Sequence, residues 1–237
     1  MILELKDVNA FYGNSHILFD VSLGVEEGDS VCILGRNGVG KSTTLKSIMG
    51  LLNAGNHSSV TGSIRFADKE LVKLPPYRIS RAGIGYVPQG RQIFPTLTTK
   101  ENLQIAAKAG PDGSKFWNME KIYELFPSLK NRENVKGNRL SGGEQQMLAI
   151  ARGLMQNPKM LLLDEITEGL APIVVDELVE IIEQLRSYKV SILVAEQNVR
   201  FAMNVSRYCY IIEKGSIVYH GETAKIPQEV LDQYLGA

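Results

Sequence analysis

Apolar residues alternate with polar or small residues over much of the first 34 positions of the chain. Leu3 and Leu5 begin the alternation and residues 17–25 continue it, which is the period of a half-buried strand. We therefore expect an antiparallel sheet at the N-terminus. Residues 31–34 are a continuous apolar run, and residues 42–49, after the following glycines, have a helical pattern. This order predicts a buried strand, a glycine loop and a helix.

The middle of the chain has a helical pattern instead. Thr98 and Glu101 form a capping box, in which the threonine and the glutamate satisfy each other's backbone donors at the start of a helix. Apolar and aromatic side chains then recur at helical spacing, namely those of Met119, Ile122, Tyr123 and Phe126. We interpret residues 91–155 as a helical subdomain inserted into a single domain, whose core comprises residues 1–90 and 156–237.

The last third of the chain alternates strand and helix patterns. Residues 160–163 and 190–195 are apolar strands, and a helical face lies between them, formed by Val174, Leu178, Ile181 and Leu185. Such alternation predicts a parallel sheet with crossover helices. Residues 208–213 and 216–219 indicate a hairpin, and residues 229–235 a closing helix. We therefore expect an α/β protein with a mixed sheet.

Composition disfavours several kinds of partner and compartment. Lysine and arginine number 26, as do aspartate and glutamate, so the net charge is zero and gives no bulk attraction to nucleic acid or anionic lipid. The apolar runs are far shorter than the roughly 18 residues of a membrane span, and residues 1–4 do not resemble a secretory signal. Cys32 and Cys209 lie in strand patterns and are expected to be buried thiols. We expect a cytosolic protein that meets the membrane through other proteins.

A glycine-rich loop follows the strand at residues 31–34. Its glycines let consecutive backbone N–H groups converge on phosphate oxygens, while Lys41 reaches the outer phosphates and Ser42 offers a hydroxyl to Mg²⁺. The position between a predicted strand and a predicted helix makes the pattern specific. We assign nucleotide binding to Gly35, Arg36, Asn37, Gly38, Val39, Gly40, Lys41, Ser42 and Thr43.

Two carboxylates end a later apolar strand. Asp164 and Glu165 follow residues 161–163, so they fall at the sheet edge where open α/β sheets bind ligands. Asp164 is expected to hold Mg²⁺, and Glu165 to polarise a water for in-line attack on the terminal phosphate of a nucleotide. The alternative, a helix cap or a solvated acidic pair, is disfavoured by the glycine loop in the same chain.

Residues 140–146, with the sequence Leu-Ser-Gly-Gly-Glu-Gln-Gln, open another helical pattern. The unpaired N–H groups and the positive end of that helix suit a phosphate. Because the glycine loop already provides one phosphate site, this second site needs a nucleotide of its own.

Together these motifs resemble the nucleotide-binding subunit of an ABC transporter, over nearly the whole chain. The resemblance implies a P-loop NTPase fold of the ABC type, with an N-terminal antiparallel β subdomain and a helical subdomain. It implies that ATP, with Mg²⁺, is hydrolysed to ADP and phosphate by two ATPase units that close face to face. Each ATP then lies between the phosphate loop of one unit and the signature segment of the other, here Leu140, Ser141, Gly142, Gly143 and Glu144.

The resemblance also assigns roles to isolated residues. Gln89 is implied to contact Mg²⁺ and the attacking water and to link the site to the helical subdomain, although a Pro-Gln pair alone would indicate only a loop. Tyr12 matches the aromatic residue that stacks on adenine, where a packing role would otherwise be the default. Gln197 stands where most members have a histidine that contacts the terminal phosphate, and its amide can still donate a hydrogen bond.

Two further positions depart from the general family pattern. Ile166 replaces the proline that usually follows the catalytic glutamate, which affects the rigidity of the loop and not its chemistry. Ala171 stands where many members have an aspartate that couples the two sites across the dimer. With Gln197, it suggests that the two half-sites of this chain do not contribute equally.

Several stretches narrow the resemblance to importers. The resemblance to the second ATPase of branched-chain amino acid importers is carried by residues 90–98, 169–172 and 196–198. Those that favour the related urea and short-chain amide importers lie at residues 15–18, 35–41 and 167–169. The alternatives are a lipopolysaccharide-type export ATPase and a soluble ABC ATPase without a transport role.

The implied partners are a second ABC ATPase subunit, integral membrane permease subunits and, indirectly, an external solute-binding protein, with no nucleic acid. The second ATPase is expected to be a different chain, although a homodimer stays open. These partners would place the protein peripherally on the cytoplasmic face of the inner membrane.

Overall fold

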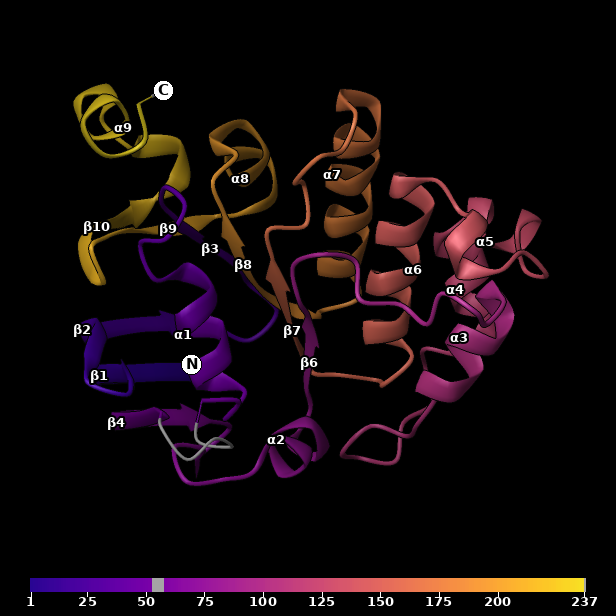
Figure 1. Ribbon diagram of the computed structural model, residues 1–237, viewed down its shortest axis with the longest axis horizontal. Coiled ribbons are helices and arrows are strands. Elements are labelled where there is room, and N and C mark those ends of the chain that lie inside the picture. Colours follow the sequence, from indigo (N-terminus) through magenta and orange to yellow (C-terminus); the bar gives the residue numbers. More distant parts are fainter. Residues whose placement is uncertain (53–57, 237) are drawn as a thin grey trace.

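The computed structural model of the protein describes residues 1–52 and 58–236, which form two sheets and the helices around them (Figure 1). One sheet is antiparallel throughout, with the strand order β2-β1-β4-β5. Its strands are Leu3–Tyr12 (β1), Ser15–Val25 (β2), Ser58–Phe66 (β4) and Lys69–Glu70 (β5). The antiparallel sheet expected at the N-terminus is confirmed.

The second sheet has six strands in the order β10-β9-β3-β8-β7-β6. All neighbouring pairs are parallel except β9 and β10, which form the predicted hairpin. Its strands are Ser30–Leu34 (β3), Ile84–Val87 (β6), Met160–Asp164 (β7), Ser191–Glu196 (β8), Tyr208–Glu213 (β9) and Ser216–Glu222 (β10). The mixed sheet is therefore also confirmed.

The central strands of this sheet are buried on both faces, which explains their unbroken apolar runs. In β3, Cys32 and Leu34 pack into the core on the helical side, whereas Val31 and Ile33 pack into the core shared with the antiparallel sheet. Cys32 and Cys209 are both buried free thiols, as expected.

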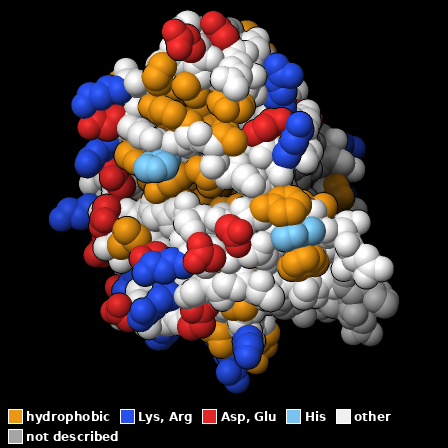
Figure 2. Space-filling model, turned by 90° about the vertical axis from the view of Figure 1, so that its left-hand side faces the viewer, with side chains coloured by type: hydrophobic (Ala, Val, Ile, Leu, Met, Phe, Trp, Pro, Cys, Tyr) orange, Lys and Arg blue, Asp and Glu red, His pale blue; other side chains and the backbone are white. Residues whose placement is uncertain are grey.

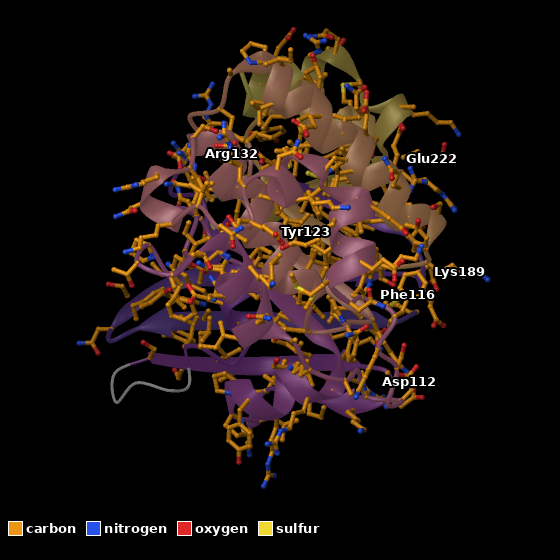
Figure 3. The ribbon with its side chains drawn as sticks, turned by 90° about the vertical axis from the view of Figure 1, so that its right-hand side faces the viewer. Asp112, Phe116, Tyr123, Arg132, Lys189 and Glu222 are labelled. Atoms are coloured by element: carbon orange, nitrogen blue, oxygen red, sulfur yellow. The ribbon has the colours of Figure 1, made fainter. Side chains whose placement is uncertain are left out.

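Helix Lys41–Ile48 (α1) contacts strands of both sheets and lies between them. The opposite face of the six-stranded sheet is covered by Gly142–Leu154 (α6), Pro172–Ser187 (α7) and Val199–Val205 (α8). Beyond α6 lie Thr99–Ala106 (α3), Met119–Leu125 (α4) and Pro127–Asn131 (α5), on the side that faces the viewer in Figure 3, where Tyr123 and Arg132 are labelled. The remaining helices are Pro76–Ala82 (α2), Gln228–Tyr234 (α9) and the short 3₁₀ turns Gly137–Arg139 and Thr223–Lys225.

Some helix boundaries differ from the sequence expectation. The helix after the glycine loop begins at Lys41 and ends at Ile48, one residue earlier at each end than predicted. Gly40, with a φ of 117°, is its N-cap, and Met49 is its C-cap. The capping box of Thr98 and Glu101 is present as predicted. No helix within the described residues is long and apolar enough to cross a membrane.

Candidate functional site

The glycine loop joins β3 to α1 at the carboxyl edge of the parallel strands. Gly38 has a φ of 80° and Gly40 one of 117°, in the left-handed region that favours glycine. At Gly35 a Cβ would lie 2.7 Å from the carbonyl oxygen of Ile212, so a side chain has no room there. The loop and Glu165 line a small cavity of about 100 Å³ at the N-terminus of α1, where the helix dipole favours an anion.

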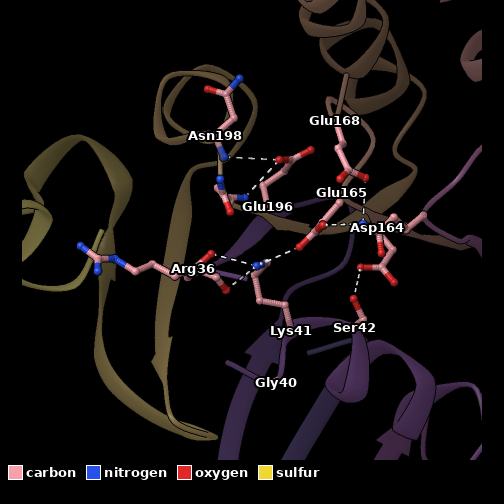
Figure 4. A network of polar contacts seen from close by, with 12 residues as sticks. Arg36, Gly40, Lys41, Ser42, Asp164, Glu165, Glu168, Glu196 and Asn198 are labelled. Carbon is pink, nitrogen blue, oxygen red and sulfur yellow. Dashed lines mark hydrogen bonds and ion pairs between the residues drawn. The ribbon is translucent and has the colours of Figure 1, made fainter. Parts of the chain in front are cut away.

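Lys41 is buried within this loop, with its side chain only 2 % exposed. Its ammonium donates hydrogen bonds to the carbonyl oxygens of Gly35 and Arg36, at 2.8 and 2.9 Å, and forms an ion pair with Glu165 Oε1 at 2.9 Å (Figure 4). A buried charge is tolerated when it is paired and hydrogen-bonded. These contacts therefore fix the cation between the loop and the second of the two acidic residues.

Asp164 ends β7 and faces α1. Ser42 Oγ donates a hydrogen bond to its Oδ1 at 2.8 Å, and the Tyr86 hydroxyl donates one to its Oδ2 at 2.9 Å. Burial raises the pKa of Asp164 above its usual value. The two hydrogen bonds oppose this shift, and the neighbouring Glu165 adds to it. The sequence pattern gave no role to Tyr86, which reaches Asp164 because β6 lies beside β7 in the sheet.

Glu165 follows in a left-handed backbone conformation, with a φ of 46°. Such a residue stores roughly 1–3 kcal/mol of strain and persists only where its surroundings hold it. Here its N–H donates to the carbonyl oxygen of Ala195 at 2.8 Å, and its Oε2 accepts a hydrogen bond from Gln89 Nε2 at 2.9 Å. The same amide nitrogen donates to Glu168 Oε2 at 2.8 Å. The structure thus brings Gln89 and Glu165 into direct contact.

Glu196, at the end of β8, is a buried carboxylate that the sequence reasoning missed. It accepts hydrogen bonds from Thr167 N–H and Thr167 Oγ1, both at 3.0 Å, and from the N–H groups of Gln197 and Asn198, at 3.2 and 3.4 Å. Burial raises the pKa of Glu196 above its usual value, although these hydrogen bonds oppose the shift. The carboxylate fastens the segment that carries Gln197 to the segment that follows Glu165.

A cleft of about 350 Å³ opens beside this junction. Asn37 of the glycine loop, Glu165 and Gln197 line it together, although they come from three separate segments of the chain. Gln197 therefore lines the same space as Glu165, the predicted catalytic carboxylate.

Two residues assigned to nucleotide binding lie differently. The Arg36 side chain points away from Lys41 (Figure 4), and a Cβ at Gly236 would lie 2.6 Å from Arg36 Nη2, so Arg36 contacts Lys41 through its backbone carbonyl. Tyr12 is 41 % exposed at the end of β1. Figure 2 shows the side of the molecule at which β1 ends and β2 begins, where hydrophobic side chains gather in patches between charged ones.

The signature segment is organised by contacts within its own neighbourhood. Ser141 is the N-cap of α6 and forms a capping box with Glu144, whose Oε1 also accepts a hydrogen bond from Arg132 Nε at 3.0 Å. Partial burial favours a higher pKa for Glu144, but the hydrogen bonds from Ser141 and Arg132 hold it below its usual value. Among the described residues, no hydrogen bond or ion pair joins the signature segment to the glycine loop.

The two other unusual residues have clear local positions. Ile166 is buried in the core on the helical side of the sheet. Ala171 is the N-cap of α7 and provides no side-chain cap, although Pro172 at the first helical position fixes a helical φ. An aspartate at position 171 would have supplied that cap as well as a charge.

The described residues contain no group of three or more histidine, cysteine, aspartate or glutamate side chains arranged to hold a metal. The donors beside the loop are the Ser42 hydroxyl, the Asp164 carboxylate and the Gln89 amide. Such hard oxygen ligands suit Mg²⁺, which is usually bound through one or two protein groups together with phosphate oxygens and water. The residues present therefore fit Mg²⁺ as a companion of bound phosphate.

Comparison with known proteins identifies the family of the chain. The sequence pattern described as "ABC transporter" matches residues 18–168, more than half of the chain. The chain belongs to the ABC transporter family.

Relatives of this ABC ATPase match it over nearly their whole length. It is 42 % identical, over 99 % of the chain and 100 % of the relative, to the high-affinity branched-chain amino acid transport ATP-binding protein BraG of Pseudomonas aeruginosa. It is 37 % identical, over 93 % and 92 %, to a probable branched-chain amino acid transport ATP-binding protein LivF of Archaeoglobus fulgidus. Identity to the lipopolysaccharide export ATP-binding protein LptB of Escherichia coli is lower, at 34 % over 99 % and 97 %.

Solved cassettes have the same fold as this ABC ATPase. A nucleotide-free ATP-binding cassette from an ABC transporter gives a TM-score of 0.81 at 27 % identity, covering 100 % of this chain and 95 % of that one. A dimeric cassette in a post-hydrolysis state, bound to ADP and Pi, gives 0.76 at 27 % identity, covering 93 % and 98 %. The expected P-loop NTPase fold of the ABC type is confirmed, and the chain is an ATPase of this family.

Proposed function

We propose that this ABC ATPase powers the import of branched-chain amino acids, or of urea or short-chain amides, through a membrane permease. The observation that carries the proposal is the meeting of Lys41, Asp164 and Glu165 at one sheet edge, in a chain similar to BraG along its whole length. The lower identity to LptB supports export less than import.

In the proposed site, the backbone of residues 35–43 and the Lys41 ammonium bind the phosphates of ATP, and Tyr12 stacks on the adenine. Ser42, Gln89 and Asp164 hold Mg²⁺, which when bound supplies positive charge against the phosphate oxygens. The buried position of Lys41 keeps its charge weakly screened, so its attraction for a phosphate is strong.

Glu165 is the proposed general base. Its Oε1 is paired with Lys41 and its Oε2 with Gln89, so both oxygens are oriented before any reaction. A terminal phosphate competes for the same ammonium, which releases Oε1 to accept a proton from a water that attacks in line. Gln89 and Gln197 are proposed to orient the water and the terminal phosphate, since Gln89 bonds Glu165 and Gln197 lines the cleft beside it.

The signature segment is proposed to complete the site of another ATPase chain. In the part of the chain that the structure describes, the exposed Ser141 and the start of α6 form no hydrogen bond with the phosphate loop, which supports a role across a dimer. Residues 91–155 are proposed to move as a unit with Gln89 when ATP closes that dimer, and to transmit the movement to a permease on the cytoplasmic face of the membrane.

A surface cleft supports this contact with a permease. It has a volume of about 410 Å³ and is lined from the sheet side by Lys46 and Tyr86 and from the helical side by Ala149 and Arg152. Because it spans the two parts proposed to move relative to each other, a helix of the permease seated there would follow their movement.

Replacement of Glu165 tests the proposed chemistry. In the purified full-length chain, Glu165→Gln removes the base but keeps an amide that can bond Gln89, so turnover should fall at least about a hundredfold while ATP-dependent dimerisation persists. The control is Glu177→Gln, an exposed carboxylate of α7 outside the site. Near-normal turnover of Glu165→Gln would remove Glu165 from this role.

The transported solute needs a separate experiment. We expect permease subunits to be recovered with the tagged chain from detergent-solubilised membranes. Reconstituted vesicles should then take up labelled leucine or labelled urea only when ATP is supplied on the side of the ATPase. Recovery of ribosomes or DNA in place of permeases would contradict a transport function.

A further inference from the structure

The side chain of Arg91 joins three segments around the site. Its Nη2 donates hydrogen bonds to the carbonyl oxygens of Glu168 and Gly169, at 3.2 and 3.3 Å. A Cβ at Gly142, the first residue of α6, would lie 2.6 Å from Arg91 Nη1. One guanidinium thus contacts the loop behind Glu165 and covers the start of the signature helix, from a position two residues after Gln89.

The backbone around these contacts is left-handed at several residues, two of them not glycine. Gly90 and Arg91 have φ values of 86° and 51°, and across the contact Glu165 and Gly169 have values of 46° and 63°. Left-handed backbone at a non-glycine residue persists only where the surrounding structure holds it. Because a guanidinium offers several donors in a planar fork, Arg91 can hold two carbonyl groups at once.

Other contacts hold residues 165–169 from the opposite side. Glu196 binds Thr167, and the N–H of Glu165 binds the end of β8. On the side of the Gln89 loop, the fastenings are the Gln89 amide, which binds Glu165 and Glu168, and Arg91. Gln89 is assigned to the chemistry itself. Of these two described contacts, that of Arg91 is therefore left to position residues 165–169 without taking part in the reaction.

We infer that Arg91 is a positioning residue that fixes the Gln89 loop to residues 165–169 and to the start of α6, so that movement of the signature helix and placement of Glu165 are linked. The inference rests on the proposed hydrolysis at Glu165. It assigns Arg91 no contact with the nucleotide. Loss of the link should therefore lower kcat and leave nucleotide binding unchanged.

The kinetic test uses the purified full-length chain. Arg91→Ala should lower kcat by about tenfold to a hundredfold, as expected for a misplaced catalytic group, with KM for ATP within about twofold of the wild type. Arg91→Lys, which keeps a charge but can bond only from a single point, should recover part of kcat. The control Arg65→Ala removes an exposed arginine of β4 and should change neither constant. Unchanged kcat in Arg91→Ala, or an equal loss in Arg65→Ala, would overturn the inference.

A second measurement does not depend on catalysis. Hydrogen exchange of the backbone amides in residues 89–92 and 165–169 should become faster in Arg91→Ala, while exchange in β3 stays unchanged because the global fold is retained. Unchanged exchange in both loops would refute the link even if the proposed hydrolysis failed. If exchange rises and Glu165→Gln leaves turnover intact, the proposed hydrolysis fails and the link stands.

The neighbour of Arg91 on α6 gives a further check. A methyl group at Gly142 would displace the guanidinium. Gly142→Ala should therefore slow turnover in the otherwise wild-type chain, and should slow it by a smaller factor when Arg91→Ala is already present. Fully additive losses would show that the guanidinium does not act at Gly142, and would contradict that part of the inference.

Discussion

The phosphate loop and the signature segment differ in where their partners lie. In the first region, Lys41 is bonded to Gly35 and Glu165, and Ser42 is bonded to Asp164, so the partners lie inside the chain. Ser141 in the second region is exposed, and within residues 1–52 and 58–236 its hydroxyl bonds only Glu144 of the helix that it caps. Both regions present the N-terminus of a helix, yet among the residues that the structure describes only the first is surrounded by groups suited to bound phosphate and a metal.

This difference indicates that the two regions contribute to different stages of the reaction. A site whose charged groups are already paired and oriented can bind ATP with little rearrangement. A helix start that is merely capped has polar groups available to a ligand brought by another chain. We therefore expect changes in the phosphate loop to abolish binding and chemistry together, and changes in the signature segment to act only on the closed dimer.

The largest effect is expected at Lys41. Lys41→Met keeps the apolar stem but removes the charge, so ATP binding should weaken strongly and turnover should fall about a hundredfold to a thousandfold. Binding is checked by titration with a fluorescent ATP analogue, and turnover by phosphate release. Lys69→Met, at an exposed position of β5, is the control. If Lys41→Met bound ATP normally, the contrast between the two regions would lose its basis.

An intermediate effect is expected at Ser141. Ser141→Ala removes both the cap of α6 and the proposed contact with the partner's ATP, and the lost cap alone costs about 1 kcal/mol of stability. Ser141→Gly removes the hydroxyl as well, but glycine at an N-cap costs only a few tenths of a kcal/mol. Both variants should bind ATP normally and show a similar loss of turnover, despite different melting temperatures.

The outcome for Ser141 separates capping from catalysis. If Ser141→Gly restored turnover along with stability, the hydroxyl would serve only to cap the helix. A mixed dimer sharpens the comparison, because a signature variant in one chain should silence the nucleotide bound to the phosphate loop of the other.

The same contrast explains how much of the site was predictable. The phosphate loop and the pair Asp164 and Glu165 are local patterns attached to strands and a helix, so their spacing alone indicated where they would meet. Arg91, Tyr86 and Glu196 carry equally direct contacts, but each acts on a residue dozens of positions away. Their roles depend on strand order and loop conformation, which periodicity does not encode.

Short helices gave weaker signals. Pro127 opens α5 at a first-turn position, where its missing N–H is harmless. The short helices α2 and α8 have only seven residues each and were not predicted, because so few turns give a weak periodic signal. α8 nevertheless follows directly after Gln197 and Asn198, and Asn198 caps it.

The smallest effect is expected at Gln197, where the chain departs from its family. If the amide only orients the terminal phosphate by donating a hydrogen bond, Gln197→His should retain turnover within about threefold, since one donor replaces another at a cost of about 0.5 kcal/mol. The imidazole has an ordinary pKa of about 6.5, so it gains a positive charge as the pH falls. A cation beside phosphate is favourable, and the ratio of variant to wild-type turnover should therefore rise between pH 8 and pH 6. Complete inactivation would contradict an orienting role and would show that the cleft requires the amide itself.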